Sequence, residues 1–181
     1  MGNGGSEHAR RTVGGKGEAM RKAAVIALVV MASVVFAANV MAQSGIREEC
    51  VTLCKAAAKF MNEKGFYPTV AEINNKEGKF ITKNTYVFMM DMEGHLLAHP
   101  FNPQYIGRKL IDNKDTNGKL YVQECIAIAK STGEGWTEYM QPTLEEMKKP
   151  TPWNEKISSK KINFVYRVPG KDYVVVAGFF E

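Results

Sequence analysis

The stretch of sequence that decides the fold is DMEGHLLAHPFNPQYIGRKLIDNKDTNGK, residues Asp91–Lys119. It begins with an acidic turn that ends on glycine, Asp91–Gly94, and continues into a short apolar segment that ends in His99 and Pro100. The proline holds the preceding His99 in extended backbone, because its ring clashes with a helical residue before it. The stretch therefore predicts a strand before Asp91, a tight turn, and a short second strand over 95–98 that returns antiparallel to the first.

The segments on either side of this stretch extend the prediction to a whole sheet. Tyr86–Met90 is apolar at every position, which is typical of a strand that is buried on both faces. A helix is predicted over Leu120–Ser131, and a hairpin turn at Pro169–Asp172 joins the last two strands. The later strands are predicted at Gly135–Gln141, Lys161–Arg167 and Tyr173–Phe180. We therefore expect an α+β fold with an antiparallel sheet of five to six strands and a long loop over 144–159.

Two helical segments precede the sheet. Apolar residues recur at helical spacing over Ile46–Lys64, and a shorter helix is predicted over Thr69–Asn74. Cys50 and Cys54 lie one turn apart on the apolar stripe of the first helix, so a metal pair or a disulfide has to be weighed against free buried thiols. Successive turns of a helix orient two such side chains poorly for a bridge. We expect free thiols that pack as small apolar groups, and the same for Cys125.

The amino-terminal segment has the three-part pattern of an export signal. Arg21 and Lys22 precede an uncharged run, Ala23–Ala42, whose last residues are of the kind that signal peptidase accepts. We predict cleavage after Ala42; the alternative is an uncleaved membrane anchor, since about 20 apolar residues can span a bilayer. The predicted organisation is a leader and signal over 1–42, a helical segment over 43–79 and a core over 80–181. The location is then periplasmic or extracellular, or anchored to the membrane.

The charge of the chain argues against a nucleic-acid partner. The formal net charge is +5 over 181 residues. Five basic and two acidic residues precede Ala42, and the remainder carries 19 Lys and Arg against 17 Asp and Glu. Nucleic-acid binding requires basic residues clustered on one face, and the sequence has no such cluster in the predicted core.

Eight short motifs in a fixed order carry a family resemblance that runs from Phe80 to the last residue. They are Tyr86–Phe88, Asp91–Gly94, Leu97–Pro100, Gly107–Leu110, Lys114–Lys119, Gly133–Tyr139, Lys160–Lys161 and Gly178–Phe179. In this order they resemble the single Cache domains of type 2 (sCache), which are extracytoplasmic sensors. The resemblance implies a PAS-like α+β fold in which a long N-terminal helix packs on the sheet.

The same resemblance implies the kind of ligand and partner. Domains of this family bind small organic acids such as acetate, propionate, lactate or pyruvate and need no cofactor. They usually belong to chemoreceptors and sensor kinases, whereas this chain stops at Glu181. We therefore expect a domain that delivers its signal to a membrane signalling partner or acts as a homodimer.

Two polar residues are the first candidates for contact with a carboxylate. His99, at the end of the second strand, can donate a hydrogen bond to an anion; the alternative is a histidine that only caps the local turn. Lys161 matches a lysine at the start of a core strand in the family. A cation that enters a sheet is unfavourable unless it has a partner, so a bound anion is a reasonable role. The alternative is a solvated edge lysine beside Lys160.

Three aromatic residues complete the predicted ligand site. Trp136 and Tyr139 match the Gly-Trp-x-x-Tyr motif of the family, and each carries a hydrogen-bond donor. Residues three apart on a regular strand face opposite ways, so both line one pocket only if a bulge intervenes. The alternative is core packing for at least one of them. Phe88, on the first strand, would form an apolar wall.

The sequence also bears on two other classes of function, metal binding and catalysis. Asn113, Asp115, Asn117 and Gly118, followed by Glu124, match the spacing of a calcium-binding EF-hand loop except for asparagine at the first position. A structural or calcium-binding interaction protein is therefore the alternative function. However, no helix precedes the loop, so we predict a turn without metal. No motif of a known catalytic class is present, and we predict that the chain is not an enzyme.

Overall fold

The computed structural model describes residues 7–143, 145–146 and 156–181. The chain forms two compact units, 1–44 and 45–181, which are described separately below. Helix α1, Glu7–Lys64, begins in the first unit and ends in the second. Helix α2, Phe66–Asn74, follows after Gly65, which adopts a positive φ of 84° that suits glycine.

The first unit, in its described part, consists of α1 alone. Its apolar side chains, including Val25, Ile26 and Leu28, are exposed. Among the described residues, no helix combines the length and the hydrophobicity needed to cross a membrane. Sequence periodicity predicted a helix from Ile46, whereas α1 already includes residues from Glu7 onward. No proline precedes Pro68, and an isolated glycine such as Gly45 is tolerated inside a helix.

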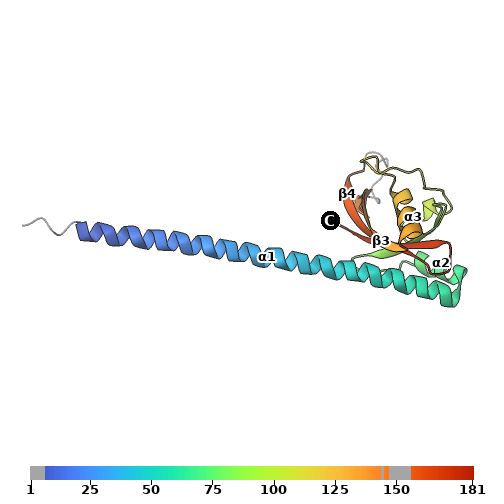
Figure 1. The fold of residues 1–181 in the computed structure, drawn as a ribbon, viewed down its shortest axis with the longest axis horizontal. Helices are drawn as coiled ribbons and strands as arrows, with labels where there is room; N and C mark the ends of the chain where they lie inside the picture. The colour runs from blue at the N-terminus through green and yellow to red at the C-terminus, as the bar shows by residue number, and fades with distance from the viewer. Residues whose placement is uncertain (1–6, 144, 147–155) are drawn as a thin grey trace, which may run out of the picture. The chain divides into compact units, whose positions relative to one another are not determined.

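The second unit contains one five-stranded sheet in which every pair of neighbours is antiparallel (Figure 1). The strand order is β2-β1-β5-β4-β3. The bounds are β1 Tyr86–Asp91, β2 Leu96–Ala98, β3 Glu134–Pro142, β4 Ser158–Arg167 and β5 Tyr173–Phe180. A 3-10 turn, η1 (Pro103–Tyr105), and helix α3 (Tyr121–Ser131) connect β2 to β3. The α+β class and the antiparallel sheet predicted from the sequence are confirmed.

Helices cover both faces of this sheet. Residues 45–64 of α1, together with α2, pack on one face around a core that includes Cys54, Met61 and Phe164. Helix α3 packs on the other face (Figure 1). There Val122 and Ile126 meet side chains of β1, β4 and β5. The three cysteines are free and buried, as the sequence predicted.

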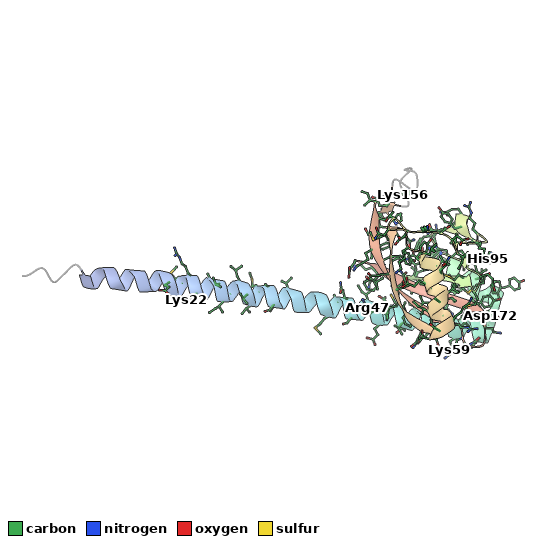
Figure 2. All side chains as sticks on the ribbon, turned by 45° about the horizontal axis from the view of Figure 1, so that its top comes forward. Lys22, Arg47, Lys59, His95, Lys156 and Asp172 are labelled. Carbon is green, nitrogen blue, oxygen red and sulfur yellow. The ribbon has the colours of Figure 1, made fainter. Side chains whose placement is uncertain are left out.

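The turn between β1 and β2 explains the acidic-x-x-Gly motif. Asp91 Oδ1 accepts hydrogen bonds from the backbone N–H groups of Glu93, at 3.0 Å, and His95, at 2.8 Å. Asp91 Oδ2 lies 2.8 Å from His95 Nδ1, and Gly94 adopts a φ of 85°. Figure 2 shows His95 at the surface of the domain, well apart from Arg47 of α1. His95 therefore stabilises the turn. After it, the chain runs antiparallel to β1, through β2, to His99.

The predicted starts of two strands near the site differ from the structure. Strand β4 begins at Ser158 rather than Lys161, which makes Lys161 an interior residue of the strand. Strand β2 begins at Leu96, and His95 forms only an isolated bridge to Lys109. Most of the predicted loop over 144–159 lies outside the described residues.

Candidate functional site

A cavity of about 770 Å³ lies on the α3 face of the sheet. Its wall includes Phe88 of β1, His99 after β2, Tyr139 of β3 and the first turn of α3. The loop that follows Pro100 contributes Asn102 and part of the segment before α3. Cavities of this size accommodate small organic molecules. Three of the five predicted site residues therefore line one cavity.

His99 is fixed in the wall of the cavity by backbone and ring contacts. Its backbone N–H donates to Asn74 Oδ1 of α2 at 2.9 Å. Its ring stacks on Phe88, with the centroids 5.5 Å apart, and lies 5.1 Å from the ring of Tyr86. The side chain is only 5% exposed. Helix α2 therefore helps to position His99 in the cavity wall.

The hydrogen bonds of His99 identify which ring nitrogen carries the proton. Nδ1 accepts from the backbone N–H groups of Phe101, at 3.1 Å, and Asn102, at 3.0 Å. Burial, and then the positive charge of Lys161, lower the pKa of His99 to about 3. The ring is therefore neutral at physiological pH, with its proton on Nε2. Nε2 lies 3.3 Å from the side-chain amide of Asn102, and its proton is donated to that group when the amide oxygen is turned toward the ring, or to a ligand acceptor in its place.

Lys161 is a fully buried cation, with 0% of its surface exposed. Its ammonium donates to the hydroxyl of Tyr86 at 3.0 Å and lies 4.5 Å from the centre of that ring. The rings of Phe88 and Phe180 are each 5.5 Å away. Among the described residues, no carboxylate forms an ion pair with it. Lys161 is not itself in the cavity wall. However, two residues next to it are: Phe88, and Tyr139, which is the cross-strand neighbour of Lys161.

Two tyrosines form a flat aromatic surface in the cavity. The rings of Tyr121 and Tyr139 stack with centroids 4.5 Å apart and planes at 28°. Burial raises the pKa of Tyr139 well above its ordinary value, and burial also raises the pKa of Tyr121. Both hydroxyls are therefore neutral hydrogen-bonding groups.

Trp136 does not join the other predicted site residues. Strand β3 pairs with β4 in unbroken register from Glu134 to Pro142, so no bulge brings Trp136 and Tyr139 to the same face. Trp136 instead packs on Phe164, with ring centroids 5.2 Å apart, and under the guanidinium of Arg47 at 4.7 Å. It lies on the α1 side of the sheet, outside the cavity wall, so the prediction that it belongs to the site is not carried further.

The calcium-like spacing of the loop before α3 belongs to a hydrogen-bonded turn. Asp115 Oδ1 accepts from the backbone N–H groups of Asn117 and Lys119, both at 2.9 Å. Asp115 Oδ2 accepts from Met140 N–H of β3 at 2.8 Å. Burial acts to raise the pKa of Asp115, but these backbone donors and the Lys119 charge hold it below its ordinary value. Within the described residues, no group of three acidic, histidine or cysteine side chains could hold a metal.

Sequence reasoning missed several residues that shape the site. Tyr86 was assigned only to a strand, yet it is the hydrogen-bond partner of Lys161. Asn74 and Asn102 contact His99, and Tyr121 stacks on Tyr139. The one local signal was the proximity of Asn102 to the His-Pro motif. The other contacts join residues that are far apart in the chain.

A family model matches the greater part of the chain. The model is described as a Cache domain (dCache_2), and it matches residues 71–181. This match shows the family and agrees with the resemblance seen in the motifs. The finer assignment to the single Cache domains of type 2 stays a prediction.

Solved structures share the fold. The periplasmic sensor domain of a chemotaxis protein is 21% identical, with a TM-score of 0.53 over 76% of this chain and 91% of that chain. A Cache chemosensory domain studied for carboxylic acid recognition is 18% identical, with a TM-score of 0.56 over 81% and 95%. A methyl-accepting chemotaxis protein from Vibrio parahaemolyticus is 14% identical, with a TM-score of 0.58 over 76% and 89%. These structures share the fold, and the match of the family model over residues 71–181 shows that the chain belongs to the Cache domain family.

Proposed function

We propose that this Cache domain senses a small organic carboxylate, which it binds in the cavity beside Lys161. The observation that carries the proposal is the burial of Lys161 without an acidic partner among the described residues. A buried and uncompensated charge is strongly unfavourable. A ligand carboxylate would supply the missing negative charge.

The neighbouring groups suit the same ligand. Neutral His99 has Nε2–H as a donor, and the hydroxyls of Tyr121 and Tyr139 can donate as well. Phe88 provides an apolar wall at the same end of the cavity. The similarity to a Cache domain that was studied for carboxylic acid recognition supports this choice of ligand. Every group named acts by binding, so the domain works as a sensor and not as an enzyme.

The proposal includes an extracytoplasmic location. The basic residues Arg21 and Lys22, the uncharged run that follows them and the small residues before Gln43 support export by a signal segment. The ligand signal then passes to a membrane signalling partner or through a second copy of the chain. Amino-terminal sequencing of the exported protein tests this part, and the expected first residue is Gln43.

The binding proposal is tested by thermal unfolding of the purified protein with acetate, propionate, lactate and pyruvate, and by mass spectrometry of any acid that co-purifies. A carboxylate that binds only the folded state raises the melting temperature by mass action. We expect such a rise in the parent protein and its loss in the Lys161→Met variant. A panel of carboxylates that leaves the melting temperature unchanged would contradict the proposal.

A further inference from the structure

The cavity is much larger than a two-carbon acid requires. Acetate has four non-hydrogen atoms and displaces about four waters, or ~120 Å³ at ~30 Å³ per water. The cavity has a volume of about 770 Å³. Acetate bound at Lys161 would leave most of this space to water, next to walls that are largely apolar.

Part of the cavity wall is formed by side chains of one apolar cluster. Two strands, the loop before α3 and the first two turns of α3 contribute to this apolar wall. Its residues are Met90, Leu96, Leu110, Val122 and Cys125. Burial raises the pKa of Cys125 to about 12, so its thiol is neutral and packs as an apolar group. A ligand with a hydrophobic body would cover this wall and exclude water from it.

Among the described residues, Lys161, next to the cavity wall, is the one buried Lys, Arg, Asp or Glu side chain. The charged side chains in the wall itself are Lys114, which is exposed, and Asp115, whose two carboxylate oxygens accept backbone N–H groups. The tyrosine pair Tyr121 and Tyr139 is neutral and offers flat aromatic surface. The interior therefore matches one carboxylate and lacks a buried partner for a second one.

We propose that the preferred ligand is a monocarboxylate with an apolar body, such as the benzyl group of phenylacetate or the alkyl chain of hexanoate, which fills more of the cavity of about 770 Å³ than acetate does. The carboxylate lies toward Lys161 and His99, and the body lies against the apolar wall defined above. This inference rests on the proposed function and names the class of acid within it. According to this inference, larger monocarboxylates bind more tightly than acetate does.

The test is calorimetry of the full chain with acetate, butanoate, hexanoate, phenylacetate and adipate. Each buried methylene should tighten binding about fourfold, so hexanoate and phenylacetate should bind at least ~10-fold more tightly than acetate, with butanoate between them. Adipate, with a second charge at the apolar end, should bind more weakly than hexanoate. Acetate that binds as tightly as hexanoate, or adipate that binds more tightly, would overturn the inference and leave the proposed function standing. If no acid binds, both fail.

A pair of variants links the chain-length preference to this wall. Val122→Phe puts a larger side chain in the wall and so takes up space in the cavity. Leu110→Ser removes apolar surface from the wall at a partly exposed position, where a smaller side chain causes no overpacking. In each folded variant the ratio of hexanoate to acetate affinity should fall several-fold. The matched control is Tyr67→Ser on α2, where the side chain is 83% exposed and lies outside the cavity wall. An unchanged ratio in Leu110→Ser would contradict the proposed position of the apolar body.

Discussion

The ammonium of Lys161 donates a hydrogen bond of 3.0 Å to the hydroxyl of Tyr86, which is a neutral acceptor. The same tyrosine ring lies 5.1 Å from the ring of His99. One aromatic side chain therefore joins the buried cation to the neutral imidazole. Tyr86 accepts a hydrogen bond from one of the three N–H groups of the ammonium, but as a neutral group it does not balance the positive charge. The remaining donors and the charge are what a bound carboxylate would use.

Lys161→Met should weaken ligand binding and at the same time stabilise the unliganded protein. Loss of a charge-assisted hydrogen bond should weaken carboxylate binding about tenfold to a hundredfold. Without ligand, removal of an unpaired buried charge should raise the free energy of unfolding by about 1 kcal/mol, although Tyr86 loses its partner. Calorimetry and urea unfolding measure the two effects.

Lys160→Met is the matched control for this experiment. Lys160 is the preceding residue, points to the other face of β4 and forms ion pairs with Glu138 and Glu181. Its replacement should leave carboxylate affinity unchanged. Equal losses of affinity in the two variants would indicate a general effect of net charge and would remove Lys161 from the site.

His99 should make the stability of the unliganded protein depend on pH. Its pKa is about 3 in the folded protein, and an exposed histidine has a pKa of about 6.5. Between these values the unfolded chain binds more protons, so the free energy of unfolding falls as the pH drops below 6.5. From pH 7 to pH 5 the His99 contribution should be a loss of about 2 kcal/mol. Urea unfolding of the parent and of His99→Asn measures it, and equal pH dependence in both proteins would refute the assignment.

Calcium should not stabilise the domain. The carboxylate oxygens of Asp115 already accept three backbone N–H groups, so millimolar calcium should leave the melting temperature unchanged. Asp115→Ala should lower the free energy of unfolding by about 1 kcal/mol, because two part-buried N–H groups and one exposed N–H group lose their acceptor. The control Asn117→Ala, at an exposed position, should change it by less than about 0.5 kcal/mol. A calcium-dependent rise that Glu124→Gln abolishes would instead favour a metal site.

Gly178 of β5 should not tolerate a larger residue. A Cβ there would meet the backbone oxygen of Ile162 at 2.5 Å and the side-chain oxygen of Asn163 more closely still. We expect Gly178→Ala to lower the free energy of unfolding by about 3 kcal/mol, measured in urea. Gly45→Ala is the control, because nothing lies within 4 Å of its added Cβ and alanine favours a helix. A loss in Gly178→Ala no larger than in the control would contradict the packing described.

The elements of the fold could be predicted because each has a local signal in the sequence. The apolar run over Tyr86–Met90, the acidic-x-x-Gly turn and the hairpin at Pro169–Asp172 specify strands and their reversals within a few residues. The alternation of side chains along a strand also indicated that Trp136 and Tyr139 would separate unless a bulge intervened. The structure has no bulge there, so Tyr139 lies in the cavity and Trp136 does not.

The completed site could not be predicted, because its contacts connect distant parts of the chain. Tyr86 and Lys161 are 75 positions apart, and Asn74 and His99 are 25 apart. Such contacts depend on the strand order and on how each helix packs. An isolated Tyr or Asn in the sequence has no pattern that marks it as part of a site. Lys161 was found through family resemblance, whereas its complete burial is known only from the structure.

Trp136 lies beneath Arg47 on the face of the sheet opposite the cavity, so its fluorescence is a probe of that face. Indole emission responds to nearby charge, so in a Trp153→Phe background the fluorescence of Trp136 reports on the packing of α1 against the sheet. Ligand binding in the cavity can thus be measured by calorimetry, while the fluorescence of Trp136 records in the same sample whether the contact between Arg47 and the sheet is kept.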